Sequence, residues 1–208
     1  MLYVNNKDIV IPGQLLAENE RYGENCMSEN SKIYSKIYGM AITGNIVEVI
    51  SLKGVYVPRR DDVVIGVITG VRGPVCFVDI NSPYEGVMIS EKSNNFSSRL
   101  EENYNVRDIV SVIVSDVDEV KKTYVGRAFK IFGGNFIKIN PKRVPRVIGK
   151  NKSMLNLIKQ KSNCRIIVGQ NGVIWLSDGN VKKAIEIINF VADNAYKAGL
   201  TDKVSAIQ

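Results

Sequence analysis

The chain has 208 residues, of which 45% are hydrophobic, and its formal net charge is +7, so it is long enough for one to three small domains with apolar cores. No window approaches the roughly 18 uninterrupted apolar residues of a membrane helix, and Met1 to Asp8 lack the basic-then-apolar order of a signal peptide. We therefore expect a cytoplasmic protein without a membrane partner.

Residues 1–58 are predicted to form a small N-terminal β domain. Short strand-like runs end at turn residues such as Pro12-Gly13 and Pro58, and no helical period is present. The predicted strand regions are Ile9–Ile11, Ile42–Ile50 and Val55–Val57. The polar stretch Glu18–Ser35 between them is expected to be a loop or a loose hairpin.

Residues 59–130 are predicted to form a five-stranded barrel of the OB kind. Its predicted strands are Val63–Val71, Val75–Ile80, Gly86–Ser90, Ile109–Val117 and Tyr124–Ala128. Short strands separated by turns at Gly73-Pro74 and Ser82-Pro83 fit a small closed barrel. The long polar insert Glu91–Arg107, between the third and fourth strands, is expected to hold a helical turn or a loop.

Alternation in the second barrel strand separates a core face from an outer face. Cys76, Val78 and Ile80 share one side and suit the core, which leaves Phe77 outside beside Asp79. An exposed aromatic ring on such a strand can stack on a nucleic-acid base. The alternative is that Phe77 packs under a loop or against a neighbouring domain, and the sequence leaves both open.

Residues 131–208 have the element order βααββα, which is typical of a type I KH domain. A strand is predicted at Phe136–Ile139, and a short helix at Pro141–Ile148 precedes the loop Gly149–Lys152. The remaining predictions are a helix Met154–Gln160 with Ser153 as its N-cap, a hairpin of Cys164–Val168 and Val173–Leu176 around Asn171-Gly172, and a helix Asn180–Ala198 stopped by Gly199.

Charge is distributed very unevenly along the chain. Residues 121–177, the acid-free segment, contain thirteen Lys or Arg and no Asp or Glu, so they carry +13 while the remainder carries −6. Such a density attracts polyanions, and the Gly149 turn within it can expose backbone to a phosphate chain. Nucleic acid is therefore the favoured partner, and a merely solvated face is the alternative.

The sequence predicts no catalytic residues, no metal site and no cofactor. Histidine is absent, which removes the commonest general base near neutral pH and the commonest transition-metal ligand. Cys26, Cys76 and Cys164 are far apart and lack metal-ligand spacing. The tight acidic groups, Asp61-Asp62 and Asp116–Glu119, flank strand-like runs and are typical of turns.

Taken together, these motifs resemble one family, the S1–KH RNA-binding cap subunits of the exosome. The segments that resemble its KH domain are Gly133–Ile139, Val144–Lys150, and Gly169–Gly172 followed by Trp175. The segments that resemble its S1-type barrel are Gly66–Val71 and Phe77–Ile80. Those that resemble its N-terminal β domain are Val10–Gly13 and Tyr56–Pro58. The resemblance covers essentially the whole chain in the right order, and the compact length is similar to archaeal members.

This resemblance implies a non-catalytic subunit. In that family three cap proteins sit on a hexameric ring of RNase PH-type subunits, which degrades RNA by 3′→5′ phosphorolysis, while the cap binds single-stranded RNA and directs its 3′ end inward. The N-terminal domain is implied to grip the ring. The residues expected to contact RNA are Arg72, Phe77, Tyr84, Lys121, Lys122, Arg127, Arg143, Arg146, Gly149, Lys150 and Lys152.

The KH loop departs from the family pattern at one position. A Gly-x-x-Gly loop lets backbone amides approach phosphates, but Gly149 is followed by Lys150, Asn151 and Lys152, so the second glycine is a lysine. Lys152 either blocks that approach, which makes the KH domain largely architectural, or replaces it with a charge contact. We favour the first and place the main RNA path on the barrel, with the KH face as an auxiliary electrostatic surface.

Other classes of protein fit less well. A stand-alone nuclease needs a carboxylate–metal site that the sequence does not display. An RNA-binding transcription or translation factor is the runner-up, but the elongation factor NusA carries two KH domains after its S1-type domain. Polynucleotide phosphorylase places its KH domain before its barrel and adds catalytic domains. Neither accounts for the N-terminal β segment.

Overall fold

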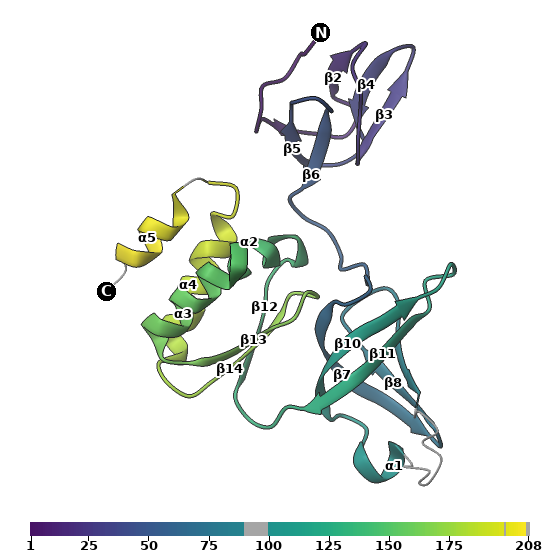
Figure 1. Ribbon diagram of the computed structural model, residues 1–208, viewed down its shortest axis with the longest axis vertical. Helices are drawn as coiled ribbons and strands as arrows, with labels where there is room; N and C mark the ends of the chain where they lie inside the picture. The colour runs from purple at the N-terminus through teal and green to yellow at the C-terminus, as the bar shows by residue number, and fades with distance from the viewer. Residues whose placement is uncertain (90–99, 198, 207–208) are drawn as a thin grey trace. The chain divides into compact units, whose positions relative to one another are not determined.

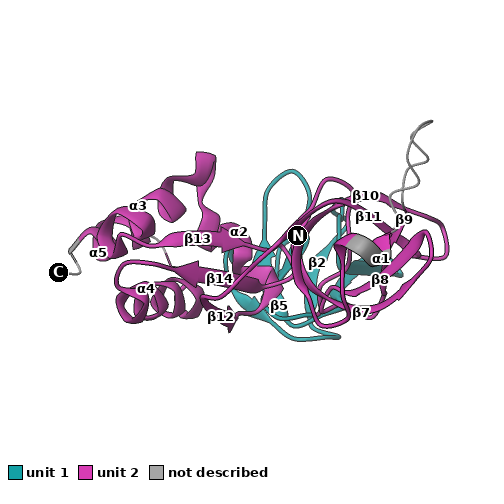
Figure 2. Ribbon diagram, turned by 90° about the horizontal axis from the view of Figure 1, so that it is seen from below, with its two compact units in different colours: residues 1–54 teal, residues 55–208 magenta. Residues whose placement is uncertain are grey.

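A computed structural model describes residues 1–89, 100–197 and 199–206 of the chain (Figure 1). The chain divides into two compact units, Met1–Gly54 and Val55–Gln208 (Figure 2). The first unit contains only strands, and the second contains a closed barrel followed by a helix-covered sheet. The predicted fold class is therefore confirmed, while the predicted boundaries 1–58, 59–130 and 131–208 stay predictions.

Unit 1 consists of two three-stranded sheets around a small apolar core. One sheet has the order β1-β5-β6, with β1 Ile9–Val10, β5 Gly39–Ile42 and β6 Glu48–Ser51. The other has the order β2-β4-β3, with β2 Leu15–Glu18, β3 Cys26–Glu29 and β4 Lys32–Ser35. Leu16, Ile33 and Val47 are almost fully buried between them. Within the predicted polar stretch, β3 and β4 form the hairpin alternative rather than a loop.

The barrel of unit 2 closes in the order β10-β11-β9-β8-β7. Its strands are β7 Val63–Arg72, β8 Val75–Asp79, β9 Gly86–Ile89, β10 Ile109–Val117 and β11 Thr123–Lys130. Cys76, Val78 and Ile80 are fully buried in its core, as the alternation predicted. The helix α1 Leu100–Asn103 lies in the predicted insert, whose residues 91–99 lie outside the described residues, as does Ser90 of the predicted third strand.

The predicted strand at Val55–Val57 is wrong, since this segment has no strand pairing. Tyr56 instead enters the barrel core, where it is 5% exposed. Its hydroxyl donates a 2.7 Å hydrogen bond to a carboxylate oxygen of Asp62. Burial, followed by this hydrogen bond, raises the pKa of Tyr56. In sequence, Val55–Val57 has the apolar pattern of a strand. In the structure the segment is irregular and pairs with no strand, and it contributes the Tyr56 side chain to the barrel core.

The KH region of unit 2 is an antiparallel sheet of order β12-β14-β13 with helices on one face (Figure 1). Its elements are β12 Asn135–Lys138, the 3-10 helix η1 Pro141–Arg143, α2 Val144–Ile148, the 3-10 turn η2 Lys150–Lys152, α3 Ser153–Ser162, β13 Arg165–Val168, β14 Val173–Ser177, α4 Val181–Asp193 and α5 Leu200–Ala206. The core lies between helices and sheet and includes Ile158, Ile174 and Ile188, all fully buried.

Two details of the predicted helices are wrong. Ser153 is the first residue of α3 rather than its cap, and Lys152 precedes the helix without a side-chain cap. The last helix ends at Asp193 and is capped by Asn194, whose backbone is no longer helical (φ −106°, ψ 20°) and whose backbone N–H and side-chain amide both donate to the Phe190 carbonyl, at 3.2 and 2.9 Å. Residue 198 of the predicted helix lies outside the described residues. A further helix, α5, follows Gly199 and buries Leu200 in the KH core.

Asn171 joins the KH hairpin to the barrel. This residue is fully buried, and its side-chain amide donates to the backbone carbonyls of Ile65 at 2.7 Å and Ile80 at 2.8 Å. The neighbouring Gln170 N–H donates to the Val63 carbonyl at 2.8 Å. Because buried polar groups cost free energy unless they are paired, this side chain fastens the hairpin tip to β7 and to the residue that follows β8.

Candidate nucleic-acid interface

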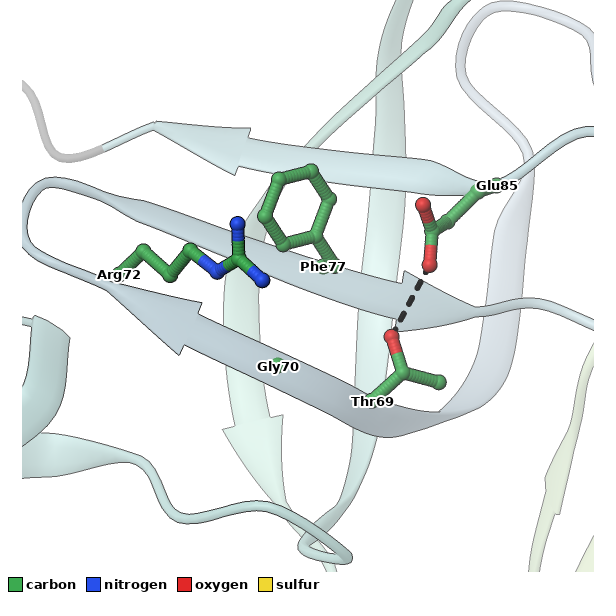
Figure 3. Close-up of a pocket in the computed structure, with 5 residues that line it drawn as sticks. All are labelled: Thr69, Gly70, Arg72, Phe77 and Glu85. Carbon is green, nitrogen blue, oxygen red and sulfur yellow. Dashed lines mark hydrogen bonds between the residues drawn. The ribbon is translucent and has the colours of Figure 1, made fainter.

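A hollow of about 380 Å³ opens on the outer side of the barrel, at strands β7 and β8 (Figure 3). Its lining residues are Thr69, Gly70, Arg72, Phe77 and Glu85. Two of the predicted RNA-contacting residues, Arg72 and Phe77, are therefore brought together, although they stand on different strands. An aromatic ring beside a guanidinium offers a stacking surface and a cation at the same place.

Local strand pairing explains why the Phe77 ring reaches this surface. Phe77 alternates with the buried Cys76 and Val78, so its side chain leaves the barrel on the opposite side and is half-buried. Across the ladder it pairs with Gly70, next to a register shift after Ile68. Because Gly70 has no side chain, the ring is not covered from β7 and remains accessible to a planar ligand.

An acidic group limits what the hollow can bind. The Thr69 hydroxyl donates a 3.0 Å hydrogen bond to the Glu85 carboxylate at one end of the hollow (Figure 3). A carboxylate repels phosphate but accepts hydrogen bonds from base amino groups or sugar hydroxyls. The geometry thus favours a base on Phe77 and a phosphate near Arg72. Sequence reasoning missed Thr69 and Glu85, because they come together only through the pairing of β7 with β8 and of β8 with β9.

The other predicted barrel residues are not among those that line the hollow. Tyr84 is half-buried in the β8–β9 connection, and its backbone N–H donates to the Ser82 hydroxyl at 3.2 Å. Lys121 and Lys122 are exposed at the β10–β11 turn, where the Lys122 ammonium lies 5.4 Å from the centroid of a tyrosine ring of β11. Arg127 is exposed on β11. Lys121, Lys122 and Arg127 make the electrostatic potential of the barrel surface more positive.

Two predicted KH cations are already engaged within the domain. The Arg143 guanidinium forms a 3.0 Å ion pair with Asp193 at the end of α4. The Arg146 guanidinium donates to the Lys197 carbonyl at 2.9 Å. These contacts hold α2 against the C-terminal end of α4. A carboxylate beside Arg143 also weakens its attraction for phosphate.

The KH loop is folded onto itself. Gly149 has φ +73°, and a Cβ there would lie 2.8 Å from the Met154 nitrogen, so glycine is required at this position. Asn151 and Lys152 both adopt left-handed backbone, at φ +52° and +62°. The Lys152 N–H donates to the Gly149 carbonyl at 3.2 Å. The Lys152 amide is thus already hydrogen-bonded within the loop, while the Lys150 and Lys152 side chains are exposed.

The cysteines contribute to the cores rather than to a site. Cys26, Cys76 and Cys164 are all buried and unpaired. Burial, with a smaller contribution from Asp108, raises the pKa of Cys76 to about 11, which keeps the thiol protonated at neutral pH. Among the described residues, no group of three or more His, Cys, Asp or Glu side chains could hold a metal ion. Within the same residues, none of the helices has the length and apolar character needed to cross a bilayer.

Two family profiles match separate parts of the chain. The one described as the exosome RNA binding protein RRP4 N-terminal domain matches residues 7–53. The one described as the KH domain matches residues 134–182.

Similar proteins come from archaea. The exosome complex component Rrp4 of Methanobrevibacter smithii is 44% identical over 98% of this chain and 72% of its own length. The protein of the same name from Methanothermus fervidus is 40% identical over 98% of this chain and 96% of its own length. A crystal structure assigned to an exosome complex RNA-binding protein aligns with a TM-score of 0.61 at 32% identity, over 73% of this chain and 93% of that one.

Proposed function

The chain belongs to the Rrp4 family of exosome components, and from this premise we propose that it is an RNA-binding subunit without a catalytic site of its own. One observation carries the proposal: Phe77 and Arg72 line the same hollow on an S1-type barrel. A half-buried ring with one side uncovered suits a base, and the adjacent guanidinium suits a phosphate. The absence of histidine from the sequence supports a role in binding rather than catalysis.

In this proposal the chain passes single-stranded RNA along the barrel and directs its 3′ end into a ring of RNase PH-type subunits. Three copies per ring, with unit 1 as the part that grips it, complete the proposed arrangement. Arg72 and Phe77 are the primary contacts. The cations of the acid-free segment draw the RNA towards this surface, since neutralised phosphates release counterions. The KH loop is mainly architectural, and a cytoplasmic location follows from this role.

Two experiments test the proposal. The purified full-length chain should bind single-stranded RNA in fluorescence anisotropy titrations, with an affinity that falls steeply as salt increases, and should not degrade the RNA in the presence of phosphate or divalent metal. Degradation that a point mutation in this chain abolishes would overturn the non-catalytic role. A tagged chain should recover RNase PH-like subunits from an archaeal extract. Recovery of RNA polymerase or ribosomes instead would favour a transcription or translation factor.

A further inference from the structure

The KH sheet has a face that its own helices do not cover. Ile166, Ile174 and Leu176 point towards α3 and α4 and are buried in the KH core. Because side chains alternate along a strand, Phe136 of β12, Trp175 of β14 and Ile167 of β13 occupy the opposite side. We call this side the outer face. The loop Gly149–Lys152 precedes α3, on the helical side, so the outer face is separate from it.

Three apolar side chains form one row across the outer face. Phe136 pairs with Trp175 in the ladder of β12 and β14, and Trp175 pairs with Ile167 in the ladder of β13 and β14. Directly opposed side chains on one face of a sheet lie within contact distance. Phe136 is 38% exposed, and Phe132 just before the strand is 77% exposed. Burial in the core therefore does not account for these aromatic rings.

The Trp175 ring is held in place before any ligand arrives. Its indole N–H donates a 2.9 Å hydrogen bond to the Gly133 carbonyl. Gly134, at φ +76°, passes so close to the indole nitrogen that a Cβ at this position would collide with it. A ring that is already fixed loses little conformational entropy when a planar ligand stacks on it. The Gly133-Gly134 turn is thus shaped around an aromatic surface.

Cations flank this row. Lys138 follows Phe136 on the same side of β12, is exposed, and places its ammonium 3.4 Å from the Asn81 side-chain oxygen. Arg165 follows the same alternation on β13, and its Nε lies 3.2 Å from an Asp178 carboxylate oxygen. Asp178 is the first acid after the acid-free segment. Rings between cations match a polyanion with planar bases better than they match an apolar protein surface.

We infer that the outer face is a second binding surface for single-stranded RNA, on which bases stack against Phe136 and Trp175 while Lys138 contacts a phosphate; Arg165, whose charge Asp178 partly offsets, adds only to the general attraction of the phosphates. This inference rests on the proposed RNA-binding function and extends it to a surface distinct from the barrel hollow and from the KH loop. Stacking explains the aromatic row, and it requires no base-specific hydrogen bond, so binding here should tolerate different sequences.

Trp175 makes this surface directly measurable, because it is the chain's single tryptophan. Tryptophan emission of the full-length protein should be quenched saturably by an unlabelled single-stranded RNA oligonucleotide. In parallel anisotropy titrations, Phe136→Ala should weaken binding about 5-fold or more, which corresponds to the loss of one stacked base. Phe136→Tyr keeps a ring and should restore binding and quenching. Tyr38→Ala removes an exposed aromatic ring from unit 1 and should change neither.

The outcomes separate this inference from the proposed function. The outer-face inference alone is overturned by three results together. Phe77→Ala weakens RNA binding, Trp175 emission does not change when RNA is added, and Phe136→Ala binds RNA with wild-type affinity. Absence of RNA binding by the wild-type chain overturns the proposed function itself. Loss of quenching in Phe136→Ala with an unchanged far-UV circular dichroism spectrum supports the inference, because the fold is then intact.

Discussion

The barrel hollow and the KH loop region both contain cations that were predicted to contact RNA, but they hold these cations differently. Arg72 lies at the surface of the hollow beside the Phe77 ring. In the KH domain, Arg143 is paired with Asp193, and Arg146 donates to a backbone carbonyl. A count of charges in the sequence treats all three as equal. The structure distinguishes an exposed cation beside an aromatic ring from cations that are already engaged in contacts within their domain.

The largest effect, on stability, is expected at Asn171, which joins the KH hairpin to the barrel. Asn171→Ala leaves the Ile65 and Ile80 carbonyls without their amide donor in a buried place. The free energy of unfolding should fall by about 2–4 kcal/mol, since each buried group without a partner costs about 1–3 kcal/mol. Urea denaturation followed by circular dichroism measures this.

The matched control for this prediction is the adjacent Gln170→Ala. Only the backbone of Gln170 bonds to the barrel, so this variant should change stability by less than about 0.5 kcal/mol. Equal stabilities for the two variants would show that the Asn171 amide does not fasten the hairpin. If RNA binding needs the barrel and the KH domain to be held together, Asn171→Ala should also weaken RNA affinity at urea concentrations too low to unfold the protein.

Sequence reasoning predicted the elements far better than the contacts between them. The five barrel strands were placed within a few residues, because short apolar runs bounded by turn residues mark each strand locally. Asn171 was interpreted only as a turn residue, since its buried role depends on a barrel more than 90 positions away in the chain. Likewise Glu85 and Thr69 gave no signal in isolation. Local patterns predict local structure, whereas these contacts depend on how the strands pair and on where the KH hairpin meets the barrel.

The next effect tests the hollow itself. Phe77→Ala should weaken RNA affinity by about 1–3 kcal/mol through the loss of one stacked base, with little change in the melting temperature. Val78→Ala, its neighbour on the core face, should do the opposite, lowering stability by about 1 kcal/mol or more with affinity unchanged. Anisotropy titrations and thermal melts of both variants measure these effects. A large loss of melting temperature with normal affinity in Phe77→Ala would make this ring a packing residue.

A smaller effect should separate the two kinds of cation. Arg72→Gln should reduce the slope of log K against log salt by about 0.7, the value for one phosphate contact on a single strand. Arg143→Gln should reduce it less, because Asp193 already offsets that charge, and its exposed ion pair contributes at most about 1 kcal/mol to stability. Affinities at four salt concentrations measure both slopes. Equal reductions would remove the distinction between exposed and engaged cations.

The smallest effect concerns Lys152→Gly, which restores the Gly-x-x-Gly spacing of the KH loop. We expect tighter RNA binding, because removal of the side chain opens the backbone of Gly149 and Lys150 to a phosphate. Glycine by itself lowers stability, since it gives the unfolded chain more conformational freedom. Lys152 adopts left-handed backbone at φ +62°, however, and glycine relieves that strain, so the free energy of unfolding should change by less than about 1 kcal/mol.

The matched control is Lys150→Gln, which removes a cation from the same loop without changing the backbone preference at residue 152. This variant should weaken binding slightly and make the salt dependence shallower, whereas Lys152→Gly should tighten binding despite the same loss of charge. Affinity titrations of both variants over a range of salt concentrations distinguish steric relief from lost charge. If Lys152→Gly also binds more weakly with a shallower slope, Lys152 is itself a phosphate contact. The KH loop would then present its cation to RNA as the barrel presents Arg72, and its architectural assignment would be wrong.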